Sequence, residues 1–440
     1  MSKSDRMELA QWTISRALKF GADQAAVAIS NEREVEVEFR DQKLEKLKES
    51  TQNSLSLKIY SDQKYSSHST NDMRKESLEK FIKEAIVSTG YLTKDEYRSL
   101  PDPKYYPQDL NIELDKYDKK YQAIETKDRV KLAAEIEKAT MAMSNKIISA
   151  TASYSDSHAH LVRVHSNGFS GESEGTSFGA GVEVTVKDPT GGRPADWFWG
   201  VTRYYDELPE PDVFGKKAVE AALAKIGQGK IESGKYTMIV ENRAASRLIY
   251  LLISPMSGRA LQQKSSFLDG MQGQQIASEK LTLIDDPYIK RGLGSRLFDS
   301  EGLAAKRRVL IEKGVLKEFL LDDYYSKKLG LEPNSGSTSN IIFEYGPNKL
   351  EDMIKNVEKG ILINSFIGGN SNSTTGDFSF GIVGQFIKDG QIVKPVNEMN
   401  ISGNSKEFWN KLVQMGNDPY LYSATRVPSL LFDDIHFSGI

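Results

Sequence analysis

The sequence predicts an α+β protein with a small N-terminal α+β domain, a central α/β segment and a β-rich C-terminal domain of sandwich or barrel-like form. The chain has 440 residues, which at about 150 residues per domain allows two or three domains. Hydrophobic residues make up 39% and charged residues 27%, as is ordinary for globular proteins. Helical and two-residue apolar periods alternate along the chain. We expect the three units to span residues 1–110, 111–232 and 233–440.

The N-terminal unit reads as helix, strand, strand, helix. Apolar residues recur at helical spacing over residues 7–18. Between residues 34 and 39, valine and phenylalanine alternate with glutamate, and residues 55–59 repeat this two-residue period of a half-buried strand. Residues 78–85 form one apolar face of a second helix, for which Asp72 is the expected N-cap.

The central unit follows a proline-rich stretch, residues 101–107, that predicts an extended linker. A helix with a buried face over residues 132–139 comes first. Strands are expected over residues 153–165, 181–187 and 197–205, and a helix is expected over residues 212–226. The glycine-rich stretch 227–234 is the expected boundary to the C-terminal unit.

The C-terminal unit begins with a predicted strand over residues 236–241 and a helix over residues 245–252. Pro255 should end or kink that helix, because its ring collides with the carbonyl four residues earlier. Beyond Glu279, short apolar segments alternate with Gly, Asp and Asn turns. This pattern predicts a β-rich sandwich or barrel-like domain.

Composition excludes several classes of function. The 58 basic and 61 acidic residues give a net charge of -3, so we expect no nucleic-acid or anionic membrane partner. Cysteine is absent, which excludes disulfides, thiolate zinc sites and cysteine nucleophiles. Residues 1–12 are polar and lack a signal-peptide core, and the most apolar stretch, 248–255, is far shorter than the ~20 residues of a membrane span. A cytoplasmic location is expected.

A literal G-x-S-x-G string occurs over Gly171–Gly175. A serine nucleophile elbow needs a strand before the serine and a helix after it. The residues that follow alternate as a strand does, so a glycine-rich turn between strands is the favoured interpretation.

Two histidines, His158 and His160, lie two residues apart in a predicted strand and therefore share a face. That spacing permits a shared metal ion. His165 has the opposite parity and would need a bulge to join them. Because no carboxylate or third ligand is evident nearby, surface or cross-strand polar residues are the alternative interpretation.

The acidic pairs 285–286, 322–323 and 433–434 are expected to be turn or capping residues, since strand neighbours face opposite ways. The basic run 306–308 is expected to be solvated. No P-loop, complete G-x-G-x-x-G or H-E-x-x-H motif occurs.

More specific strings follow one another in the C-terminal half. In order, they are Ile284–Pro287, Phe298–Gly302, Leu310–Leu316, Gly368–Ser379, Ile401–Asn404, Gly416–Asp418 and Val427–Leu430. In this order they resemble the TldD/TldE family, whose TldE branch is also called PmbA and described as a modulator of DNA gyrase. The helix-strand-strand-helix start and the Ser166–Gly168 turn are similar as well, so the resemblance spans nearly the whole chain.

The resemblance implies a two-subunit zinc metallopeptidase. In the TldD-type subunit, H-E-x-x-x-H on a helix binds zinc and supplies a glutamate base, and a cysteine helps to complete the site. In this chain Ile253 and Gly258 fall at the histidine positions and Ser254 at the glutamate position. These side chains can neither bind zinc nor act as a carboxylate base. The resemblance therefore implies a TldE/PmbA-type subunit with no cofactor of its own and with zinc in a TldD-type partner.

The expected function is that of a non-metal subunit in a peptidase acting on peptides or unfolded protein segments. The candidate substrate contacts are small residues that permit close backbone approach, although a tight structural loop is the alternative: Gly368, Gly369, Asn370, Thr375 and Gly376. The alternative function is a non-catalytic homodimeric protein that binds peptides or regulates another protein. Direct action on DNA topology does not suit the balanced charge.

For assembly, the sequence predicts that the chain alone forms a homodimer through the C-terminal domain. The apolar segments Ile361–Phe366 and Leu430–Phe432 are the expected interface, because they supply more apolar residues than one sheet face needs. The alternative is that both segments fill the core of their own domain.

Overall fold

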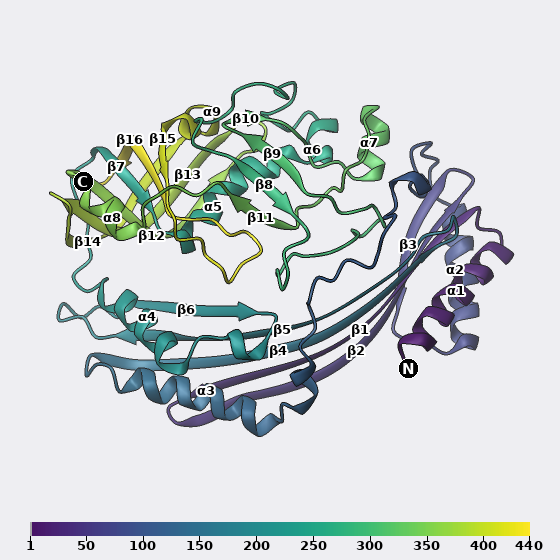
Figure 1. The fold of residues 1–440 in the computed structure, drawn as a ribbon, viewed down its shortest axis with the longest axis horizontal. Coiled ribbons are helices and arrows are strands. Elements are labelled where there is room, and N and C mark those ends of the chain that lie inside the picture. Colours follow the sequence, from purple (N-terminus) through teal and green to yellow (C-terminus); the bar gives the residue numbers. More distant parts are fainter. Residues whose placement is uncertain (1) are drawn as a thin grey trace.

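The computed structural model describes residues 2–440 and confirms the α+β fold class. Six antiparallel strands form the first sheet, in the order β3-β2-β1-β4-β5-β6. Their bounds are β1 (Gln24–Arg40), β2 (Lys43–Ser61), β3 (Lys64–Thr70), β4 (Ile147–His165), β5 (Ser170–Val186) and β6 (Ala195–Thr202). Because β1 pairs with β4 from Ala26–His165 to Arg40–Thr151, the first and central units share one continuous sheet (Figure 1).

These strands are longer than their predicted segments. In β1, the buried Ala25, Val27 and Ile29 extend the alternation that continues in Val35 and Val37. Small and polar residues between these groups mask the period in the sequence, but backbone pairing with β2 and β4 continues across them.

Four helices pack against one face of this sheet: α1 (Lys3–Lys19), α2 (Lys75–Gly90), α3 (Thr126–Met141) and α4 (Pro211–Leu223). The cap predicted for α2 is wrong in detail. Arg74 occupies the N-cap position without a side-chain bond, and Asp72 instead accepts the Arg74 N–H at 3.0 Å. The carboxylate therefore fixes the turn before the helix and does not cap its first turn.

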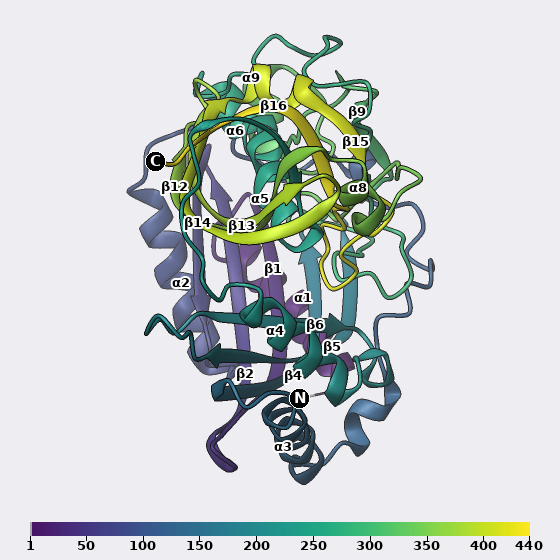
Figure 2. The same ribbon diagram turned by 90° about the vertical axis from the view of Figure 1, so that its left-hand side faces the viewer.

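The C-terminal unit contains a second six-stranded sheet in the order β14-β13-β12-β7-β16-β15. Its strands are β7 (Gly234–Val240), β12 (Lys359–Ser371), β13 (Asp377–Lys388), β14 (Gln391–Asn404), β15 (Leu412–Met415) and β16 (Leu430–Ser438). Because β14 also pairs with β16 at Ile401–Phe437, the sheet curls into a barrel-like ring, visible end-on in Figure 2. This confirms the expected barrel-like form.

A smaller sheet, β10-β9-β8-β11, completes the unit. Its strands are β8 (Leu283–Asp286), β9 (Arg308–Glu312), β10 (Val315–Leu316) and β11 (Asn340–Phe343). The helices of the unit are α5 (Asn242–Ile253), α6 (Gly258–Gln262), α7 (Asp323–Leu329), α8 (Leu350–Lys355) and α9 (Ser405–Phe408). As predicted from Pro255, α5 ends at Ile253.

The two apolar segments expected at a dimer interface lie mainly inside the molecule. Ile361, Ile363, Leu430 and Phe432 are each completely buried in the main core of the C-terminal unit. Hydrophobic burial within the chain accounts for these segments. The expectation that they form an interface surface is therefore wrong. No helix within residues 2–440 combines the length and the apolar character needed to cross a membrane.

Candidate functional site

The end of α5 carries the three positions that the family resemblance singles out. Ile253 is the last residue of α5 and packs in the core. Ser254 is exposed at the start of a short 3₁₀ turn. Gly258 opens α6, where a Cβ would lie 2.9 Å from Tyr325 Cβ and 3.2 Å from Leu321 Cδ2. Helix α7 therefore occupies the space that a side chain at position 258 would need.

The predicted substrate contacts lie together in the hairpin between β12 and β13, where all of them are exposed except Gly376, which is buried. Gly368, Gly369 and Gly376 all have positive φ, and a Cβ on Gly369 would lie 2.2 Å from Ser379 O. Glycine is therefore required by the backbone at position 369. The Arg247 guanidinium donates a hydrogen bond to the Gly368 carbonyl.

The tip of this hairpin is held by residues from two other segments of the C-terminal unit. The Asn404 amide donates to the Thr375 carbonyl at 2.9 Å and to Asp377 at 2.8 Å. Phe267 N–H donates to the Ser373 carbonyl at 2.8 Å. A shallow groove of about 360 Å³ runs beside it, lined by Ile367, Gly368, Gly369, Ser379, Gly381, Glu398, Met399 and Asn400. Asn370, Thr375 and Gly376 lie outside this lining.

The strand histidines pair with glutamates on the neighbouring strand. His158 Nε2 lies 2.8 Å from Glu174 Oε1, and His160 Nε2 lies 2.9 Å from Glu172 Oε1. Arg6 Nε donates to His160 Nδ1 at 3.0 Å, and burial lowers the pKa of His160. These contacts fit the cross-strand interpretation. The glutamates belong to a strand that pairs with β4 only in the fold, so sequence spacing did not reveal them.

The G-x-S-x-G string lies within β5, not in a turn between strands, which corrects the favoured interpretation. The strand continues to Val186, so the serine has no helix after it. Lys116 Nζ donates to Ser173 Oγ at 2.9 Å. This contact joins the irregular segment between α2 and α3, called the linker below, to the sheet. It could not be predicted from local sequence.

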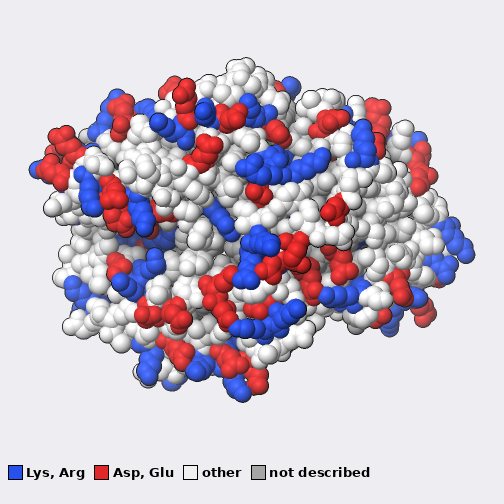
Figure 3. All heavy atoms as spheres, in the orientation of Figure 1, with Lys and Arg blue, Asp and Glu red and all other residues white. Residues whose placement is uncertain are grey.

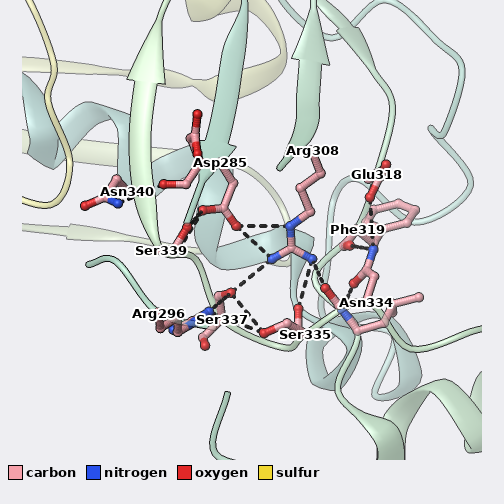
Figure 4. A network of polar contacts seen from close by, with 12 residues as sticks. Asp285, Arg296, Arg308, Glu318, Phe319, Asn334, Ser335, Ser337, Ser339 and Asn340 are labelled. Atoms are coloured by element: carbon pink, nitrogen blue, oxygen red, sulfur yellow. Dashed lines mark hydrogen bonds and ion pairs between the residues drawn. The ribbon is translucent and has the colours of Figure 1, made fainter. Parts of the chain in front are cut away.

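Arg308 is buried, not solvated as the basic run predicted (Figure 4). Its guanidinium lies 3.0 Å from Asp285 Oδ2 and donates to the carbonyls of Ser335 and Ser337, each at 3.0 Å. The other oxygen of Asp285 accepts the Ser339 N–H at 2.7 Å. Asp285 is therefore the partner of a buried ion pair and not a turn residue.

The other acidic pairs have mixed roles. Asp322 is the N-cap of α7 and accepts the Tyr325 N–H at 2.7 Å, as the capping interpretation expected. Asp433 and Asp434 lie in β16, where Asp434 pairs with Lys235 at 2.9 Å. These last two residues therefore lie in a strand and not in a turn or cap.

The half-buried Glu301 carboxyl lies at the junction between the first sheet and the C-terminal unit, near Lys58 of β2 and the buried Asp299. Burial raises the pKa of Glu301 to about 7, even though the Asp323 N–H donates to its carboxylate at 2.8 Å. Across the surface in Figure 3, basic and acidic side chains are interspersed, in keeping with the net charge of -3.

The fold defines a multidomain α+β protein with a barrel-like C-terminal unit. Models of the PmbA/TldA metallopeptidase match domain 1 over residues 25–88, the central domain over 119–226 and the C-terminal domain over 233–439. The chain belongs to the PmbA/TldD metallopeptidase family.

Several relatives span almost the whole chain. The metalloprotease PmbA of Escherichia coli O157:H7 is 26% identical, over 97% of this chain and 95% of its own length. A Bacteroides thetaiotaomicron crystal structure that carries the name modulator of DNA gyrase is 40% identical, covers 100% of both chains and has a TM-score of 0.97. TldE from Thermococcus kodakarensis shares the fold at 20% identity, with a TM-score of 0.87 over 98% of this chain and 100% of its own.

Proposed function

We propose that this chain is the non-metal, TldE-like subunit of a two-subunit zinc metallopeptidase that cleaves peptides or unfolded protein segments. The observation that carries the proposal is the packing at Gly258. Isoleucine, serine and glycine offer no zinc ligand at the three motif positions. Because α7 fills the space at position 258, restoring a histidine there would displace Tyr325.

In the proposed assembly, the TldD-type subunit would hold the zinc, which when bound would supply Lewis-acid chemistry for peptide hydrolysis. This chain would complete the cleft and hold an extended substrate. The groove beside Gly368 and Gly369 supports this role, because glycines at its wall let a peptide backbone approach closely. A cytoplasmic location belongs to the same proposal.

Metal analysis and a peptidase assay test this function together. The purified chain alone should hold no stoichiometric zinc and cleave no unfolded peptide. Activity should appear on co-expression with a TldD-type subunit and vanish when that subunit's motif glutamate is changed to glutamine. Equal activity of the zinc subunit with and without this chain would contradict the proposal. Peptide binding without hydrolysis in the complex would favour the regulatory alternative.

The oligomeric state of the chain alone is a separate part of the proposal. Two branches of one architecture that pair as unlike subunits can also pair as like ones around a two-fold axis. We expect a homodimer through the C-terminal unit, with an interface above ~2,000 Å². Light scattering at micromolar concentration measures this directly, and a strictly monomeric mass would refute it.

A further inference from the structure

A further cleft of the described chain has no residue of the α5 motif or of the β12–β13 hairpin in its lining. It has a volume of about 630 Å³ and lies between the linker, β5 and a loop of the C-terminal unit. Its lining consists of residues 112–119, 172–174, 204 and 296–298. None of these positions takes part in the proposed peptidase site.

An unpaired edge of β5 faces this cleft. The neighbouring strand β6 pairs only with Phe178–Thr185. Just before that segment, Thr176 donates its N–H to the Lys116 carbonyl at 2.9 Å, on the side away from β4. Since alternate residues of a strand direct their backbone groups to the same side, Glu174 and Glu172 direct theirs into the cleft.

This free edge is short. The Lys116 carbonyl occupies Thr176 at one end. At the other end β5 begins at Ser170, and Phe298 packs on the sheet face at Gly171. The edge therefore has room for two or three residues of an added strand, as in peptide recognition by strand addition.

Half-buried positive charge without acidic hydrogen-bond partners lies in and beside the cleft wall. Within residues 2–440, the only hydrogen-bond partner of the Lys116 ammonium is Ser173 Oγ. Burial, with the positive charge of Arg203, lowers the pKa of Lys116 to about 8. Arg203 itself donates to the carbonyls of Thr176 and Leu293. Its charge is therefore not neutralised by these contacts.

Arg296 adds a second cation to the lining. Its Nη2 donates to the Ser337 carbonyl at 2.7 Å, while its buried Nε has no partner among the described residues. An unpaired buried donor of this kind is costly unless a ligand or water completes it.

The carboxylates of the lining are already engaged. Glu172 and Glu174 pair with His160 and His158, on the opposite face of β5 from Ser173 because strand side chains alternate. Asp115 accepts hydrogen bonds from Arg291 and Tyr204. Glu113 and Asp118, which also line the cleft, accept only backbone N–H groups among the described residues. The lining therefore carries charges of both signs, and Lys116 and Arg296 are its half-buried cations without a carboxylate of the described chain in hydrogen-bond contact.

We propose that this cleft binds the carboxylate of a short extended peptide, with Lys116 and Arg296 facing the carboxylate and the backbone of Glu172–Glu174 pairing with the peptide main chain. The carboxylate is either the C-terminus of the peptide or an acidic side chain within it. The site uses residues of this chain alone, so it is testable without a zinc subunit and independently of the proposed peptidase function.

Fluorescence anisotropy with the full chain tests the site. The probes are a fluorescein-labelled tetraalanine with a free C-terminus, the same peptide as its C-terminal amide, and an amide peptide with one internal glutamate. We expect the free acid to bind about tenfold more tightly than the plain amide, the size of a charge-assisted hydrogen bond. Lys116→Met should remove this difference. Lys119→Met, an exposed residue of the same lining, should leave it unchanged.

The glutamate probe separates the two sources of the carboxylate. Binding as tight as that of the free acid assigns the site to acidic side chains as well, and weak binding assigns it to C-termini. Equal affinity for acid and amide, retention of the difference in a folded Lys116→Met variant, or no binding of any probe at millimolar concentration would each overturn the proposal. Thermal unfolding of each variant confirms that it is folded.

Discussion

Buried charges occur in two regions of this molecule, and their partners differ. Arg308, inside the C-terminal unit, is matched by Asp285 and by carbonyls of the same unit. Lys116 and Glu301, at the junction of linker, first sheet and C-terminal unit, have no oppositely charged partner in hydrogen-bond contact within residues 2–440. Removing one partner of a buried ion pair destabilises the fold, because the other charge is then unpaired. A half-buried charge without an oppositely charged partner already carries such a cost and remains available to a ligand or proton.

The largest expected effect breaks the completed pair. Arg308→Met should destabilise the protein by about 3–5 kcal/mol, because it leaves Asp285 buried without its counter-charge. Urea unfolding at pH 7 measures the change. Adding Asp285→Asn to the same chain should restore part of the lost stability, since the orphaned charge is then removed. A loss below about 1 kcal/mol in the single variant would show that the pair is not the main support of this region.

At the junction, removing a charge should stabilise the protein instead of destabilising it. The pKa of Glu301 is raised to about 7 in the folded protein, above its usual value, so the wild type loses stability as pH rises from below 5 through 7. Glu301→Gln removes that cost and can still accept the Asp323 N–H. At pH 8.5 the variant should be more stable by about 3 kcal/mol, and at pH 4 the two should be equal. A pH-independent difference between their unfolding curves would refute the assignment.

Lys116→Met should also stabilise the protein, but over the opposite pH range. A lysine whose folded pKa is depressed to about 8 carries its penalty below that pH and loses it as pH rises past the unfolded value. Allowing for partial exposure and for the lost bond to Ser173, we expect a gain of about 2 kcal/mol at pH 7. The gain should disappear near pH 10.5. Unfolding of Lys119→Met at both pH values is the matched control, and equal behaviour of the two variants would contradict the prediction.

The smallest effect comes from an exposed ion pair. Lys131 and Glu135, one turn apart on α3, lie 3.7 Å from each other with side chains 71% and 49% exposed. Solvent screens such a pair, so Lys131→Gln should not measurably change the unfolding midpoint. A clear destabilisation by Lys131→Gln would contradict the expectation that exposed ion pairs contribute little to stability.

Much of the fold was predictable because its signals are local. The α1 and α3 helices, the end of α5 at Pro255 and the alternating strands all follow from side-chain periodicity. The pairing of β1 with β4 was not predictable, since it joins distant segments whose alternation is compatible with many neighbours. The ion pair of Arg308 with Asp285 was not predictable for the same reason. The sequence of a basic run does not show whether its side chains meet a distant carboxylate or water.

The candidate sites divide in the same way. Ile253, Ser254 and Gly258 were found from ordered motifs along the chain, and the structure adds the reason that a side chain does not fit at Gly258. The cleft at Lys116 and Ser173 was missed, although its serine stood out in the G-x-S-x-G string. Its lysine lies in an extended linker with no periodicity, and only the folded chain brings the two together.

Because the first two units share one sheet, the strands of that sheet can pair only in a certain order as the chain is synthesised. β1 emerges early and pairs at once with β2, but its other edge is covered only by β4, which is made after the linker and α3. Until then a nascent chain presents a 17-residue strand with one open side, the kind of edge that recruits other strands and aggregates. A fragment ending after the first unit would keep that edge, so we expect the first two units to fold intact only when they are produced as one piece.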